Sequence, residues 1–99
     1  MTITKKREGN QLLIALEGRL DTTTSPELSA VLDAELDGVT ELLIDMEKLA
    51  YLSSAGLRVI LAAQKRMNRQ GKMTVAHVCA DIMEVFEMTG FVDILTIQN

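Results

Sequence analysis

The stretch "ELLIDMEKLAYLSSAGLRVIL", residues 41–61, joins a short apolar run to a helical pattern through a turn with two adjacent serines and a glycine. Its first six residues form an apolar run of strand length, which is typical of a strand buried on both faces of a sheet. Apolar side chains then recur at helical spacing over residues 54–70, and Gly71 is a typical helix stop. The apolar face of this helix is formed by Leu57, Ile60, Leu61 and Met67. The stretch therefore predicts a strand, a turn and a long helix in succession.

The other strands are predicted on both sides of this unit. Residues 1–7 and 11–18 are extended segments that flank residues 8–10, Glu-Gly-Asn. A short Gly-Asn connection between two such segments is a signal for an antiparallel hairpin. Residues 72–78 and residues 93–99 have the apolar, β-branched character of two further strands.

A first helix is predicted between the hairpin and residue 41, ending near residues 37–38. Two N-caps are open: Ser25 followed by Pro26 at the first helical position, or Thr24 in a capping box with Glu27. Either choice places the apolar side chains of this helix on one face.

A third helix is predicted to open with Asp81 and Glu84, a variant of the capping pattern, and to stop at Gly90. The elements then alternate as strand, strand, helix, strand, helix, strand, helix and strand. Parallel neighbours need crossover connections, so this order predicts an α/β domain with a mostly parallel sheet covered by helices. We expect residues 1–99 to form one such domain.

Composition excludes several function classes. Hydrophobic residues make up 47% of the 99 residues, and only one proline occurs, so disorder is a poor interpretation. The formal net charge of -4 gives no electrostatic reason to bind nucleic acid or an anionic membrane. Cys79 is the only cysteine, which argues for a cytoplasmic protein without disulfides. The apolar run that ends before Glu17 is too short to export or anchor the chain.

The serine turn precedes a helix, and a helix N-terminus leaves backbone N–H groups unpaired beside a partial positive charge. Either Ser53 or Ser54 fits the position of the cap, and capping alone explains serines at this place. The same amides also accept an anion or an attached phosphate. Gly56 costs up to about 1 kcal/mol in a first helical turn, which indicates that another backbone or a partner comes close there.

Four stretches of the chain resemble one family. They are "LEGRLDTTTSPEL" (residues 16–28), "LLIDMEKLAYLSSAGLRVIL" (42–61), "GKMTVAHV" (71–78) and "IMEVFEMTGFVDIL" (82–95). Together they resemble a STAS domain of the bacterial anti-sigma factor antagonist type, whose members are switched by serine phosphorylation. The resemblance implies the STAS fold over nearly the whole chain.

The resemblance also implies a site. The family's switch loop commonly reads Asp-Ser-[Ser/Thr]-Gly-Leu, and its phosphorylated serine corresponds to Ser54 here. Ser53 stands at the position of the family aspartate and is a second, less favoured acceptor. Asp21 matches the family's loop acid, although an Asx turn explains an aspartate there equally well. The partner-binding residues implied are Asp21, Ser53, Ser54, Gly56 and Arg58.

The function implied is partner switching. The unphosphorylated chain would bind an anti-sigma factor serine kinase and free the sigma factor. The kinase, with its own ATP and Mg2+, would then phosphorylate Ser54, and a Ser/Thr phosphatase would reverse the modification. The chain itself would need no cofactor. Two alternatives remain: a STAS regulatory subunit of another assembly, such as a lipid-transport ATPase, or a small-ligand or nucleotide-binding module.

An enzyme is the least favoured interpretation. The sequence has neither a Gly-x-Ser-x-Gly nucleophile elbow nor a Walker phosphate loop. His77 lies in a predicted strand without a Cys or His neighbour at ligand spacing, so we expect a core or strand-end histidine rather than a metal ligand.

Overall fold

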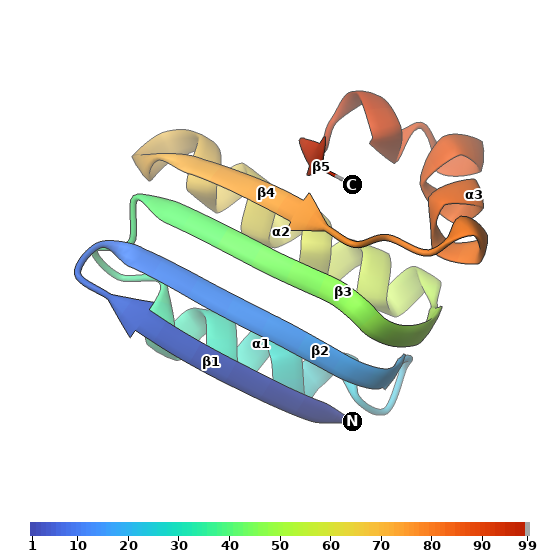
Figure 1. Ribbon diagram of the computed structural model, residues 1–99, viewed down its shortest axis with the longest axis horizontal. Helices are drawn as coiled ribbons and strands as arrows, with labels where there is room; N and C mark the ends of the chain where they lie inside the picture. Colours follow the sequence, from blue (N-terminus) through green and yellow to red (C-terminus); the bar gives the residue numbers. More distant parts are fainter. Residues whose placement is uncertain (99) are drawn as a thin grey trace.

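The structure is a computed structural model that describes residues 1–98 as a five-stranded sheet with helices packed against it (Figure 1). The elements are β1 (Thr2–Glu8), β2 (Gln11–Leu20), α1 (Ser25–Glu35), β3 (Glu41–Leu52), α2 (Ser54–Gln70), β4 (Lys72–Ala76), α3 (Ala80–Thr89), the 3-10 turn η1 (Phe91–Asp93) and β5 (Ile97–Gln98). Neighbouring strands follow the order β1-β2-β3-β4-β5. Only β1 pairs antiparallel, and the other pairs are parallel, as predicted.

The helices α1 and α2 lie side by side behind one face of the sheet (Figure 1). Alternate residues of β3 point toward them, so Leu42, Ile44 and Met46 are buried, whereas Leu43 and Asp45 are only half-buried. The expectation that this strand is buried on both faces is therefore wrong. A strand in a two-layer arrangement buries one face of its pleat and leaves the other open.

The strand β3 runs to Leu52, six residues beyond the apolar run that predicted it. Leu49 and Leu52 continue the buried face past the charged pair Glu47-Lys48, and this keeps the segment in the sheet. The last strand is shorter than predicted, because residues 91–93 form η1 and only Ile97–Gln98 pair with β4. Residue 99 of the predicted strand lies outside the described residues.

The predicted helix starts are confirmed only in part. Thr24, one of the two N-caps left open, is the N-cap of α1, but its side chain makes no capping hydrogen bond, and Pro26 lies in the first turn as expected. The helix α3 begins at Ala80 after Cys79, and the structure gives no side-chain cap there, so the Asp81 and Glu84 pattern is not used. Gly90 has a φ of 80°, the left-handed stop that the sequence indicated. None of the helices in residues 1–98 is long and apolar enough to cross a membrane.

Gly71 ends α2 at a crowded point between two connections. Its N–H donates to the carbonyl of Met67 at 2.7 Å, and the next residue, Lys72, donates to the carbonyl of Thr40 at 2.9 Å. A Cβ built on Gly71 would lie 1.9 Å from that same carbonyl oxygen of Thr40. The loop before β3 therefore leaves no space for a side chain at this turn.

We expect Gly71→Ala to lower the free energy of unfolding by about 2 kcal/mol or more, because backbone atoms must move to admit the methyl group. Gly90→Ala is the matched control, since its φ is positive but nothing lies within 4 Å of the new Cβ. Strain alone at such a position costs about 1 kcal/mol. Urea unfolding of both variants measures the difference, and an equal or smaller loss at Gly71 would contradict the crowding argument.

Candidate functional site

The two serines of the turn between β3 and α2 have different structural roles. Ser53 is the N-cap of α2, and its Oγ accepts a hydrogen bond from the N–H of Gly56 at 3.2 Å. Ser54 is the first helical residue and is exposed. Among the described residues, its hydroxyl has no hydrogen-bond partner within the chain. The cap is therefore Ser53, and Ser54 is free at the helix start.

Gly56 is buried beneath this turn. A Cβ at this position would lie 2.8 Å from Cγ of Leu20 and 2.8 Å from Cδ1 of Leu52. The close approach that the sequence indicated is thus made by the protein's own strands. Gly56, expected among the partner-binding residues, is buried in the chain itself, where it sets how deeply the start of α2 sits on β2 and β3.

The ends of β2 and β3 lie side by side, and this brings the two loops of the site together. Leu20 pairs with Leu52 in parallel register, and the N–H of Ser53 donates to the carbonyl of Leu20 at 2.9 Å. Asp21 follows Leu20 directly, so it lies at the same edge of the sheet as the serine turn. Carboxyl ends of parallel strands are the usual place for functional loops in such sheets.

The carboxylate of Asp21 organises its own loop. Its Oδ1 accepts hydrogen bonds from the N–H groups of Thr23 and Thr24, both at 3.0 Å. The hydrogen bond from the Thr24 amide is the main cause of a lowered pKa at Asp21, with smaller contributions from the Thr24 hydroxyl, the Thr23 amide and Arg19. Asp21 therefore forms the Asx turn, and its Oδ2 remains directed toward Arg19 at 3.9 Å from Nε.

Arg19 and Tyr51 form an exposed pair beside this loop that the sequence analysis missed. They are register partners on β2 and β3, and the guanidinium carbon of Arg19 lies 4.1 Å from the centre of the Tyr51 ring. Tyr51 is 41% exposed, which is unusual for a large aromatic side chain. The pair was not visible in the sequence because the register of β2 and β3 shifts at Gly18 and Arg19.

The charges around Ser54 favour an anion. The first turn of α2 holds no acidic residue. Arg58 is exposed and lies one helical turn after Ser54, on the same side of the helix. The helix N-terminus adds a partial positive charge. These groups of α2 favour a phosphate on Ser54, whereas the carboxylate of Asp21 at the same edge of the sheet opposes it.

A surface hollow lies elsewhere on the molecule. It has a volume of 410 Å³ and is lined by residues that include Leu13, Leu43 and Lys72, on the open face of the sheet. Glu41 and Lys72 begin β3 and β4, so this hollow lies at the opposite end of those strands from Ser54.

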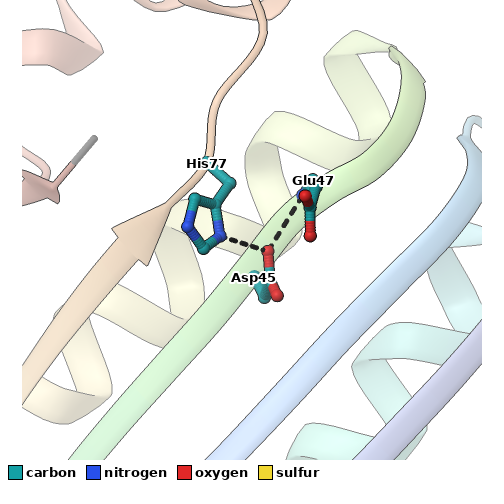
Figure 2. Close-up of side chains that lie close together, drawn as sticks. All are labelled: Asp45, Glu47 and His77. Atoms are coloured by element: carbon teal, nitrogen blue, oxygen red, sulfur yellow. Dashed lines mark hydrogen bonds and ion pairs between the residues drawn. The ribbon is translucent and has the colours of Figure 1, made fainter.

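A second polar cluster lies on β3 and just after β4 (Figure 2). Nδ1 of His77 is 3.0 Å from Oδ1 of Asp45, which also accepts the N–H of Glu47 at 3.0 Å. His77 was predicted inside a strand, but β4 ends at Ala76, and His77 is exposed with a φ of 57°. The cluster escaped the sequence analysis because Asp45 and His77 are 32 residues apart.

The cluster shifts two pKa values. The hydrogen bond to Asp45 is the main cause of a raised pKa at His77, aided by the charges of Asp45 and Glu47. Partial burial opposes ionisation of Asp45, but the Glu47 amide and His77 outweigh it and lower the pKa of that carboxyl.

The chain is similar in sequence and in fold to STAS domains and anti-sigma factor antagonists. The family model for the STAS domain matches residues 2–99. A Bordetella bronchiseptica protein named BtrV, a candidate anti-sigma factor antagonist, is 33% identical over 100% of this chain and 87% of its own length. The anti-sigma-B factor antagonist of Listeria monocytogenes is 30% identical over 96% of this chain and 85% of its own. The solved structure of the anti-sigma factor antagonist SpoIIAA in its unphosphorylated form has a TM-score of 0.79 and 16% identity, covering 99% of this chain and 88% of that one.

The division of tasks between the serines predicts unequal effects on stability. Ser53→Ala removes the cap of α2 and should lower the free energy of unfolding by about 1 kcal/mol. Ser54→Ala removes no hydrogen bond within the chain and should cost less than half as much. Urea denaturation of the two variants tests this, and equal losses would show that Ser54 also caps the helix.

The Asp45–His77 contact predicts how the protein responds to pH. A raised pKa at His77 means a stabilising contribution that is complete below the ordinary value of 6.5 and disappears as pH rises through the folded value. The lowered pKa of Asp45 means a contribution present above the ordinary value of 3.8 and lost as pH falls through the folded value. The pair therefore contributes most between these limits. An NMR titration of the His77 ring should give a midpoint above 6.5. The midpoint should fall in Asp45→Asn, and an unchanged midpoint would contradict the assigned cause.

Proposed function

This chain belongs to the STAS domain family, and from that premise we propose that it is an anti-sigma factor antagonist switched by phosphorylation of Ser54. The names of relatives that are at least 30% identical over nearly the whole chain support the antagonist class. The observation that carries the switch is the hydroxyl of Ser54, which is exposed at the start of α2 beside the loop of Asp21.

The proposed cycle assigns the chemistry to its partners. The unphosphorylated chain binds an anti-sigma factor serine kinase in the cytoplasm, and this frees the sigma factor. The kinase transfers a phosphoryl group from its own ATP, with Mg2+, to the oxygen of Ser54, and the phosphorylated chain dissociates. A Ser/Thr phosphatase restores the hydroxyl. The chain is a substrate and a binding partner in this cycle and supplies no catalytic group.

The local geometry favours Ser54 over Ser53 as the acceptor. Ser53 is half-buried, and its oxygen already accepts the N–H of Gly56 as the helix cap. Transfer to Ser53 would disturb that cap, whereas Ser54 is modified without breaking a contact of the fold. In this proposal the acceptor keeps the family's position, although Ser53 stands in place of the family aspartate.

Phosphorylation acts on the interface rather than on the fold. A phosphoserine adds about -1.5 to -2 charges, which a helix N-terminus accommodates well. Arg58, one turn further along α2, adds a cation on the same side. SpoIIAA, which shares the fold, has been solved in its phosphorylated form as well. A partner packed on the Ser54 hydroxyl instead meets added bulk and a desolvation cost, and a loss of about 3 kcal/mol weakens binding by about two powers of ten.

The proposed partner surface combines residues from both loops. Asp21, Ser53, Ser54 and Arg58 lie at or next to the carboxyl ends of β2 and β3. Arg19 and Tyr51 extend this surface along the same two strands. Gly56 belongs beneath it and supports the turn from inside.

Incubation with the anti-sigma kinase of the same genome, ATP and Mg2+ should phosphorylate Ser54, as mapped by mass spectrometry. Ser54→Ala should bind the kinase and resist modification. Ser54→Asp should bind at least tenfold more weakly, although Asp carries only one of the nearly two charges of phosphate.

Ser53→Ala is the matched control, because it keeps the proposed acceptor and should still be modified. Phosphate on Ser53 instead would show that the acceptor is the wrong serine. A stable complex without modification of either serine would contradict the switch and favour a permanently docked regulatory subunit of another assembly, such as a lipid-transport ATPase.

A further inference from the structure

We propose that Asp45, Glu47 and His77 form a binding site for a divalent transition metal, with Zn2+ as its best-suited ion. The three side chains come from β3 and from the residue that follows β4 (Figure 2). None of them belongs to the proposed partner surface, so this inference stands independently of the proposed function.

The geometry of the cluster is close to that of a coordinated ion. One ligand atom from each residue can be chosen so that all three lie within 4.8 Å of one another. Ligands at about 2.1 Å from a tetrahedral Zn2+ are about 3.4 Å apart. Oδ1 of Asp45 and Nδ1 of His77 are 3.0 Å apart, so they need to separate only slightly to reach this spacing. The site therefore requires the exposed side chain of Glu47 to turn toward the other two ligands.

The backbone places these side chains on the same open face of the sheet. Asp45 and Glu47 flank the buried Met46 on β3, so both project away from the core. His77 has a positive φ of 57°, the only such value for a non-glycine residue in the described part of the chain. Its N–H donates to the carbonyl of Gln98 at 3.4 Å, and this contact helps to hold the ring over β3.

The donor set selects the class of ion. Imidazole nitrogen suits Zn2+ and its neighbours in the first transition row, whereas Mg2+ and Ca2+ prefer oxygen ligands alone. Three protein ligands leave a fourth position for water, as in open zinc sites. Binding replaces the proton that His77 and Asp45 share and requires neutral imidazole. Among the described residues, neither Glu47 nor Oδ2 of Asp45 forms an ion pair that a metal ion would have to break.

An ion at this site would cross-link β3 to the connection that leads into α3. It would join residues 32 positions apart in the sequence and would bind the folded state only. Binding of an ion to the folded state alone raises the stability of the protein with the logarithm of the ion concentration, once this exceeds the dissociation constant.

Calorimetric titration of the metal-free full chain with ZnCl2 tests the proposal. We expect one saturable site with a dissociation constant in the micromolar range and a rise in the melting temperature. His77→Asn should lose at least tenfold in affinity, and asparagine is chosen because it tolerates the positive φ. Asp45→Asn and Glu47→Gln should each weaken binding about tenfold or more.

Two control variants test whether the three proposed residues are the metal ligands. Cys79→Ser should bind as well as the unmodified chain, because this exposed thiol is not among the proposed ligands. Glu84→Gln removes an exposed acid on α3 and should leave the affinity unchanged. Absence of saturable binding, binding that survives His77→Asn in a folded protein, or binding lost in Cys79→Ser would each overturn the proposal. None of these outcomes depends on a kinase or on Ser54.

Discussion

The parallel pairing of β2 with β3, extended to Leu20 and Leu52, is the interaction on which the rest of the structure depends. It ends with the hydrogen bond from the N–H of Ser53 to the carbonyl of Leu20. Because the two strands end together, the loops that follow them lie side by side. The start of α2 packs at Gly56 directly against the side chains of Leu20 and Leu52. The position of the serine turn is thus a consequence of sheet register.

The same arrangement separates the fold from the proposed switch. Ser53 caps α2 and Gly56 allows its close packing, so both residues contribute to the stability of the fold. Ser54 carries neither task and is exposed. A modification that adds charge at a helix N-terminus then changes what a partner meets without removing a contact of the core. A small domain can report a phosphorylation event in this way while its structure stays nearly constant.

Local chemistry predicted most of the elements, and the family resemblance supplied the proposed acceptor Ser54, whereas pairings between distant segments could not be predicted. The hairpin at Gly9, the stop at Gly71 and the helix start at Ser54 each depend on a few adjacent residues, and the structure has all of them. The stacking of Arg19 on Tyr51 depends on register shifts between β2 and β3, and the pattern of apolar and polar residues does not predict such shifts. The contact of Asp45 with His77 depends on the β3–β4 alignment and on a strand that ends at Ala76. The length of β3 was underestimated because charged residues interrupt its apolar pattern.

The central claim is that the edge formed by the ends of β2 and β3 is the partner surface. Mapping of backbone amide shifts after addition of the unmodified partner kinase, without ATP, tests it most directly. We expect the perturbed amides to cluster around Asp21, Tyr51 and residues 53–58, with little change elsewhere on the sheet. Perturbations centred on the open face around Leu13 and Leu43, with the serine turn unaffected, would contradict the account.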